Sequence, residues 1–343
     1  MARVDVTVRG AGIFGLSIAW SCVQQGARVR VVDPFGPASG SSGGVVGALA
    51  PHVPENWNEK KAFQLDSLLM AGAFWQGVEA AGGVSAGYAR TGRLQPVADE
   101  AALTLARARA DGAAALWRGQ AVWEVIRATD AGAFVPETPT GWLIRDTLSA
   151  RLHPRQACEA LVAALEARGV SIVAEALDEG AVVWATGWRG LLDLGEALGR
   201  KVGDGVKGQA SLLAFDAGDA PQLFVDGLHL VPHADGTLAV GSTSERDFDA
   251  PDTTDGQCDA LIARARAAVP ALAQAEVVAR WAGVRPRARS RAPLLGARPG
   301  RPGHFVANGG FKIGFGMAPK VAEVMAALVL EDRDTIPEGF RLS

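Results

Sequence analysis

The chain has 343 residues, of which 48% are hydrophobic and 21% charged. This composition excludes collagen-like, disordered and coiled-coil proteins, and the length predicts two domains or one large one. The formal net charge of −3 offers no bulk positive charge to nucleic acid or acidic lipid, and no apolar run reaches the roughly 18–20 residues of a membrane span.

Cysteine and histidine spacing predicts neither disulfides nor a metal site. The three cysteines lie far apart, as is typical of free thiols in a reducing compartment, and we expect no export signal and a cytoplasmic protein. The five histidines form no HxxxH or HExxH pattern. These residues are Cys22, Cys158, Cys258, His52, His153, His229, His233 and His304.

The first 33 residues predict a βαβ unit. Residues 3–9 alternate valine with polar residues, which is the period of a strand. An apolar helical stretch follows and ends at Gly26, a residue type that commonly terminates helices. Residues 27–33 are then expected to form a second strand, stopped by Pro34.

The rest of the chain alternates helical and strand-like segments. Helices are expected at 59–77, 99–119, 154–168, 254–269 and 317–330. Strands are expected at 92–97, 181–185 and 305–308, with several short antiparallel strands between 207 and 241. Residues 37–47 form a loop rich in Gly and Ser, which suits either a flexible linker or a backbone that approaches a ligand closely.

This order of segments predicts an α/β fold with two parts. The first is a Rossmann-type dinucleotide-binding domain built from discontinuous segments, assigned to 1–85, 146–205 and 282–343. The second is a smaller α+β substrate domain with an antiparallel sheet, assigned to 86–145 and 206–281.

The βαβ unit carries the pattern G-x-G-x-x-G in Gly10, Gly12 and Gly15, and Asp33 ends the second strand, 18 residues after Gly15. Glycines at this spacing let the backbone approach a pyrophosphate, whose charge meets the helix N-terminus. Asp33 can accept hydrogen bonds from ribose hydroxyls, and its charge disfavours the 2′-phosphate of NADP. We therefore expect a dinucleotide site here in preference to a glycine turn without a ligand.

The chain resembles the D-amino acid oxidase superfamily of flavoproteins, and glycine oxidases in particular. Five segments carry the resemblance, in the order of the family. They are the βαβ unit, the small-residue loop 39–52, V-V-W-A-T-G at 182–187, W-A-G-V-R-P-R-A-R-S-R-A-P-L-L-G at 281–296, and G-G-F-K-I-G-F-G-M-A-P at 309–319.

The resemblance implies FAD bound non-covalently, since no cysteine lies between Arg285 and Gly309, where some relatives attach the flavin. It also implies a backbone contact to adenine near residues 173–177, in a segment (169–182) that is shorter than the family's. The implied cofactor-binding residues are Gly10, Gly12, Ile13, Phe14, Gly15, Asp33, Pro34, Ser41, Ser42, Gly47, Ala48, Leu49, Ala185, Thr186, Gly187, Trp188, Gly309, Gly310, Phe311, Lys312 and Ile313.

The resemblance also implies residues that contact the substrate. Arg285, in V-R-P, matches an arginine that binds the substrate carboxylate through two parallel hydrogen bonds, and Lys312 matches a position where relatives carry a cation. His229 stands where glycine oxidases have a tyrosine, Ser244 aligns with a pocket position, and His52 follows the flavin loop. The alternatives are a surface ion pair for the arginine, an exposed loop for the lysine, and solvent-facing strand or turn positions for the others.

The activity that this resemblance implies is oxidation of a small amino acid or N-substituted glycine, with a small-molecule substrate and O2 as partners and no membrane. Hydride passes to the flavin, the imine hydrolyses to a 2-oxo acid and an amine or ammonia, and O2 is reduced to H2O2. Two alternatives stay open. The chain also resembles the module that removes a carboxymethyl group from a tRNA wobble uridine, and it suits an FAD subunit of an amino acid dehydrogenase that passes electrons to a partner. The oligomeric state is left open.

Overall fold

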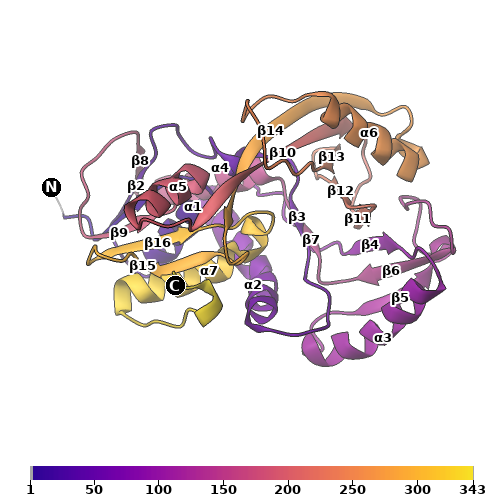
Figure 1. The fold of residues 1–343 in the computed structure, drawn as a ribbon, viewed down its shortest axis with the longest axis horizontal. Coiled ribbons are helices and arrows are strands. Elements are labelled where there is room, and N and C mark those ends of the chain that lie inside the picture. The colour runs from indigo at the N-terminus through magenta and orange to yellow at the C-terminus, as the bar shows by residue number, and fades with distance from the viewer. Residues whose placement is uncertain (1–2, 343) are drawn as a thin grey trace.

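A six-stranded sheet forms the centre of the first half of the molecule in the computed structural model, which describes residues 3–342 (Figure 1). Its strand order is β15-β16-β9-β1-β2-β8, and every neighbouring pair is parallel except β15 with β16. The strands are β1 (Val6–Arg9), β2 (Val29–Val32), β8 (Ser171–Val173), β9 (Ala181–Trp184), β15 (Leu294–Ala297) and β16 (His304–Asn308).

An eight-stranded sheet forms the second half, in the order β14-β10-β13-β12-β11-β4-β6-β5. It is antiparallel except where β11 pairs with β4. Its strands are β4 (Arg93–Pro96), β5 (Trp123–Arg127), β6 (Trp142–Asp146), β10 (Gly203–Ala214), β11 (Gln222–Val225), β12 (Leu228–Pro232), β13 (Thr237–Gly241) and β14 (Glu276–Ala288). A two-stranded sheet pairs β3 (Ala48–Leu49) with β7 (Ala150–Arg151).

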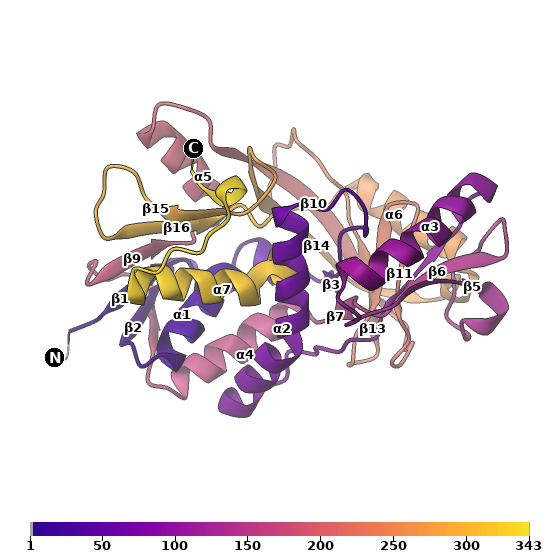
Figure 2. The ribbon, with the colours of Figure 1, turned by 90° about the horizontal axis from the view of Figure 1, so that it is seen from below.

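Helices cover both sheets. In Figure 2, α1, α4 and α7 lie on one side of the first sheet and α5 on the other, while α2 packs against α4 and α7. In the second half, α3 packs on β5, and α6 packs on β10, β12 and β13. The helices are α1 (Ile13–Gln24), α2 (Glu59–Gly82), α3 (Glu100–Leu116), α4 (Pro154–Glu166), α5 (Gly187–Ala197), α6 (Gly256–Ala268) and α7 (Gly314–Glu331). Four short 3-10 helices lie at Ser41–Gly43, Ala128–Asp130, Pro270–Leu272 and Glu338–Phe340.

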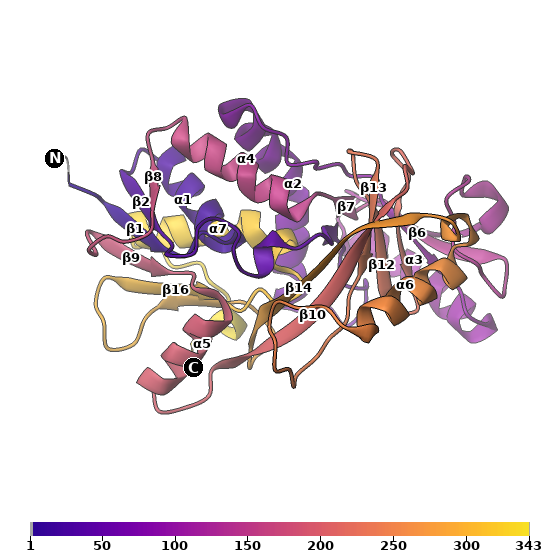
Figure 3. The same cartoon turned by 90° about the horizontal axis from the view of Figure 1, so that it is seen from above.

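Two long strands join the halves. β10 and β14 pair along almost their whole length, and Figure 3 shows them running from beside α5 in the first half to α6 in the second. Both strands cross the boundaries assigned from the sequence at residues 205 and 281, so the halves share a continuous strand pair. The exact domain boundaries stay a prediction, whereas the α/β fold with a second, mainly antiparallel sheet is confirmed.

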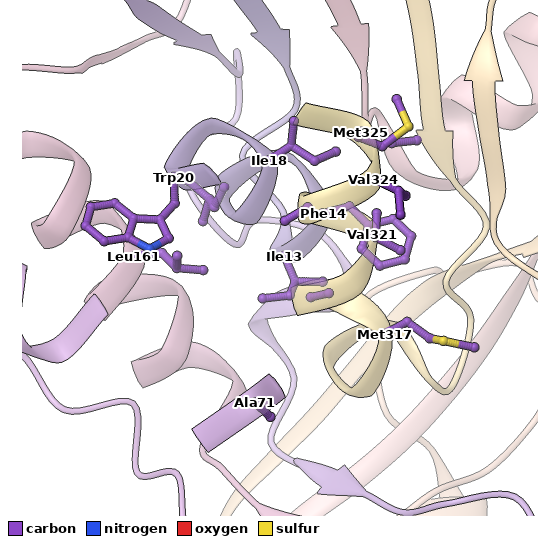
Figure 4. Close-up of a cluster of buried hydrophobic side chains, with 14 of the residues drawn as sticks. Ile13, Phe14, Ile18, Trp20, Ala71, Leu161, Met317, Val321, Val324 and Met325 are labelled. Carbon is purple, nitrogen blue, oxygen red and sulfur yellow. The ribbon is translucent and has the colours of Figure 1, made fainter. Parts of the chain in front are cut away.

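The largest core lies beneath the first sheet, where α1 packs against α7 and α4 (Figure 4). In this core Phe14 and Ile18 of α1 lie close to Val321 and Met325 of α7, and the side of α1 that carries Trp20 faces α4. Because helices cover both faces of the sheet, β1 is buried on both sides, as central parallel strands usually are. A separate core lies between the second sheet and α6.

One expected helix was given the wrong end, and several strands were not predicted from the sequence. The helix expected at 59–77 runs on to Gly82, because Gly77 keeps a helical conformation and Gly83, in the left-handed region at φ +69°, ends the helix. The 13-residue strand β14 was missed, because it mixes small, charged and apolar residues and contains Pro286, and pairing with β10 is what holds it extended. No helix within residues 3–342 has the length and apolar character needed to cross a membrane.

Candidate active site

A cavity of about 870 Å³ lies where the two sheets meet, near the upper end of the usual range for small-molecule sites. Its walls come from the turn between β1 and α1, the loop of residues 39–48, the turn between β9 and α5, β14, and the turn between β16 and α7. All five segments singled out in the sequence therefore contribute to one cavity.

The glycine turn before α1 is built so tightly that larger residues do not fit. Gly10 has φ +105°, and a Cβ there would lie 2.3 Å from the carbonyl oxygen of Ala185, the residue that follows the neighbouring β9. A Cβ on Gly15 would lie 1.8 Å from the carbonyl oxygen of Gly10. The glycine motif is thus required by backbone packing, and it leaves the start of α1 open to the cavity.

Three helices begin at the cavity without a side-chain cap. The residues preceding α1, α5 and α7 are Gly12, Thr186 and Ile313, and within residues 3–342 none of their side chains accepts a hydrogen bond from the helix, whereas α2, α3, α4 and α6 all have side-chain caps. In the part of the chain that the structure describes, the one side chain that accepts a hydrogen bond from these first-turn amides is that of Ser42, whose Oγ accepts from the Ile13 amide at 3.0 Å. Unpaired first-turn amides and positive helix ends suit the diphosphate of a dinucleotide.

Asp33 lies on the cavity wall and also holds the glycine turn. Its Oδ2 accepts a hydrogen bond from the Ala11 amide at 2.8 Å, and its Oδ1 accepts one from the Phe35 amide at 3.0 Å. A carboxylate has about four lone-pair sites, so capacity for ribose hydroxyls remains. The cavity therefore fits the dinucleotide expected from the sequence.

Arg285 on β14 lines the cavity beside a glycine that makes room for it. A Cβ on Gly208 of β10 would lie only 1.9 Å from Nη1 and 2.3 Å from Cζ of Arg285. Nη1 donates a hydrogen bond to the carbonyl oxygen of Thr243 at 3.3 Å. Burial lowers the pKa of Arg285 to about 10, an effect that the Glu245 carboxylate opposes, so the guanidinium is charged at neutral pH.

Lys312 lies on the same cavity wall. Burial, and then repulsion from Arg285, lower the pKa of Lys312. Among residues 3–342 its ammonium has no hydrogen-bond or ion-pair partner, and it lies 5.8 Å from the ring centroid of Phe311. Two cations that repel each other at one cavity form a site whose electrostatics favour an anionic ligand.

The other three candidates for substrate contact do not line the cavity. The His229 side chain is half-buried, with its ring centroid 4.7 Å from that of Phe224, and loss of solvation, then the charges of Arg93 and Lys312, lower its pKa to about 3. Within residues 3–342 its Nδ1 is buried and has no hydrogen-bond partner. Ser244 is exposed, and His52 donates its backbone amide to Gln64 Oε1 at 2.8 Å, which ties it to α2.

Most of the implied cofactor residues line the cavity, and the exceptions are immediate neighbours of residues that do: Gly15, Leu49, Gly309 and Ile313. The segment 173–177, expected near adenine, is absent from the cavity wall.

Sequence reasoning missed several cavity residues. Arg9 lies 5.4 Å from the ring centroid of Trp184 and pairs with Asp178 at 2.6 Å, which explains a charged residue before the first glycine. Trp281 also lines the cavity, with its indole lying where a Cβ of Gly283 would be. Trp281 stood in the segment 281–296 that carries the family resemblance, whereas no sequence pattern predicted that Arg9 would line the cavity.

Comparisons with known proteins agree with this geometry. The model of the family of FAD dependent oxidoreductases called DAO matches residues 5–328. The glycine oxidase of Pseudomonas aeruginosa is 34% identical over 126 residues, 36% of this chain and 34% of that protein. A putative thiamine biosynthesis oxidoreductase of Rhizobium etli is 28% identical over 350 residues, covering 96% of this chain and 97% of the relative.

Glycine oxidases are also found among solved structures. The crystal structure of glycine oxidase from Geobacillus kaustophilus matches with a TM-score of 0.84 at 22% identity, covering 100% of this chain and 99% of that one, a likeness of fold. The matches to three curated glycine oxidases span only 28% to 45% of their lengths. The family match over nearly the whole chain identifies the cofactor as FAD, and the chain belongs to the DAO family of FAD-dependent oxidoreductases.

Proposed function

We propose that this protein is a cytoplasmic oxidase of a small amino acid or N-substituted glycine, which converts the substrate to an imine and then to a 2-oxo acid and an amine or ammonia, with O2 reduced to H2O2. The observation that carries the proposal is the pair of cations, Arg285 and Lys312, on the wall of the FAD cavity. The glycine oxidases among the relatives support the same class of substrate.

The two cations would bind the substrate carboxylate and orient the substrate. The planar guanidinium of Arg285 can offer two parallel hydrogen bonds, and Lys312 adds a second positive charge. FAD, when bound, supplies the hydride acceptor. Holding the substrate in one orientation is then the main contribution of the chain.

The same charges would select the protonation state of the substrate amine. A substrate ammonium near Arg285 and Lys312 is repelled, whereas a neutral amine is not. The neutral amine is also the form whose lone pair can stabilise the developing imine. We therefore expect the rate of substrate oxidation to rise with pH until the cations themselves lose charge.

We also propose that FAD is held without a covalent link. Among residues 3–342, the cavity wall contains no cysteine, histidine or tyrosine, the residue types that could attach a flavin, and all three cysteines are buried elsewhere. Acid precipitation should release the flavin into the supernatant, and flavin that stays with the pellet would contradict this.

The test of the activity is anaerobic bleaching of the bound flavin by glycine, sarcosine and a panel of D- and L-amino acids, followed by a peroxide assay in O2. A bleaching substrate with stoichiometric H2O2 supports the oxidase. Bleaching with slow peroxide formation would instead favour a dehydrogenase subunit that passes electrons to a partner. No bleaching by any amino acid would overturn the proposed substrate class.

Arg285→Lys is the matched variant, because it keeps the charge and removes the planar fork. It should raise the half-saturating substrate concentration and leave the spectrum of the bound flavin unchanged. Unchanged affinity and rate would remove Arg285 from the site.

A further inference from the structure

A second cluster of functional side chains lies at the junction of the two sheets. His153, at the start of α4, and His233 and Asp235, in the turn between β12 and β13, place one ligand atom each within 4.8 Å of one another. The two imidazole centroids are 4.5 Å apart. None of the three residues lines the FAD cavity.

One ring nitrogen in this cluster is prepared to bind a cation. The Thr237 hydroxyl lies 3.0 Å from His233 Nδ1 and donates its proton to Asp235 Oδ1 at 2.7 Å. The hydroxyl oxygen must then accept from Nδ1–H, which leaves a bare lone pair on Nε2. His233 is 3% exposed, and among residues 3–342 its buried Nε2 has no hydrogen-bond partner, an arrangement that is unfavourable unless a ligand relieves it.

Asp235 is oriented in a similar way. Gln156 Nε2 donates to Asp235 Oδ2 at 3.3 Å, and Asp235 Oδ1 also accepts from the Thr237 amide at 3.1 Å. The backbone amide of Gln156 lies 3.4 Å from His153 Nδ1, which is longer than a strong hydrogen bond, so the contact by which His153 caps α4 is weak. Such outer partners are typical of residues that hold metal ligands in place.

The surrounding charges allow a cation here. Arg151 acts on His233 and Arg155 acts on His153. The Arg151 charge is offset, because its Nη2 pairs with Asp219 at 2.7 Å and its Nη1 donates to the Gly218 carbonyl at 2.7 Å. Asp235 adds a negative charge that attracts a cation to both rings.

We propose that His153, His233 and Asp235 bind one divalent transition-metal ion of the Zn²⁺ class. Two imidazoles and a carboxylate are ligands that this class prefers, and the exposure of Asp235 leaves a fourth position open to water. Metal–ligand bonds of about 2.0–2.1 Å place the ligand atoms of a tetrahedral site about 3.4 Å apart. Because the three ligand atoms already lie within 4.8 Å of one another, the turn between β12 and β13 would move inward by about 1.4 Å at most to bind the metal.

The bound metal joins the two halves of the molecule. His153 follows β7, which pairs with β3 at the end of the flavin loop, whereas His233 and Asp235 belong to the second sheet. A metal ion that bridges them binds the folded chain and not the unfolded one, so it raises the thermal stability.

The experiment uses the holoenzyme, stripped with a chelator and then supplied with Zn²⁺ or Co²⁺. The parent should retain one equivalent of either metal per chain after gel filtration, and Co²⁺ should give the visible bands of a four-coordinate ion. Zn²⁺ should raise the melting temperature. Asp235→Asn, an exposed change that keeps the turn hydrogen bonds through Oδ1, and His233→Gln should lose all three effects.

Asp216→Asn is the matched control, since it removes another exposed carboxylate beside the same turn, keeps the hydrogen bond from the Gly218 amide through Oδ1, and should retain the metal. A parent that keeps no stoichiometric metal overturns the proposal. Equal retention in the parent and in Asp235→Asn also overturns it, whether or not His233→Gln folds.

Discussion

Gly208→Ala is a sharp test of the role of Arg285, because it displaces the guanidinium and leaves the arginine itself unmutated. The new Cβ would lie 1.9 Å from Nη1 of Arg285, whereas ordinary contact begins at 3.4 Å, so the guanidinium must move by at least 1.5 Å (3.4 − 1.9). The backbone at 208 is not in the left-handed region, and alanine suits a strand better than glycine, so the fold should hold.

A displacement of about 1 Å in a positioning group can cost roughly 100-fold. We therefore expect the dissociation constant of an unreactive carboxylate to rise about 10- to 100-fold, or about 1.4–2.7 kcal/mol. The assay is a titration of the flavin absorption spectrum under anaerobic conditions. Gly256→Ala, where a Cβ meets no atom within 4 Å, is the control and should bind like the parent.

A double-mutant cycle separates this effect from a general loosening of the sheet. In the Arg285→Lys background no guanidinium is present to be displaced, so Gly208→Ala should cost much less than in the parent. An affinity within twofold of the parent for Gly208→Ala, or an equal loss in both backgrounds, would refute the reasoning.

Three further outcomes are expected. Asp33→Ala should weaken FAD binding by roughly 1.5–3 kcal/mol for each charge-assisted hydrogen bond lost, with unchanged circular dichroism, and an unchanged FAD dissociation constant would limit Asp33 to a structural role. The dissociation constant of an amine-free carboxylate should stay level from pH 5.5 to neutrality, because His229, with a pKa of about 3, is uncharged throughout this range. At higher pH it should rise as Lys312 loses its charge, and the rise should begin below pH 10.4, since the usual lysine pKa is about 10.4 and that of Lys312 is lowered. Lys312→Met should abolish this early rise, and a step near pH 6–7 would contradict the prediction. Burial lowers the pKa of His229 to about 3 and of His233 to about 4, so below about pH 6.5 the unfolded chain binds more protons than the folded chain. The metal-free protein should therefore lose about 2 kcal/mol of unfolding free energy per histidine between pH 7.5 and pH 5. Denaturant titrations at these two pH values measure the loss, and equal unfolding free energies would contradict it.

Local sequence determined much of the cofactor half. Alternating valines, Gly10 and the strand that ends at Asp33 specify the βαβ unit, because strand period and glycine conformation are properties of a few consecutive residues. The other glycine-rich and small-residue segments could be assigned to the same site in advance only through their resemblance to the D-amino acid oxidase superfamily, and the FAD-dependent family is confirmed.

Tertiary structure alone decided which side chains meet. The space beside Gly208 that admits Arg285 exists only because β10 pairs with β14, and the missed strand β14 is extended for the same reason. His153 and His233 stand 80 residues apart and become neighbours only when the turn between β12 and β13 lies beside the start of α4. Such contacts depend on packing between distant segments, whose energy no local pattern records, and so spacing along the chain gave no sign that two histidines and an aspartate would lie together.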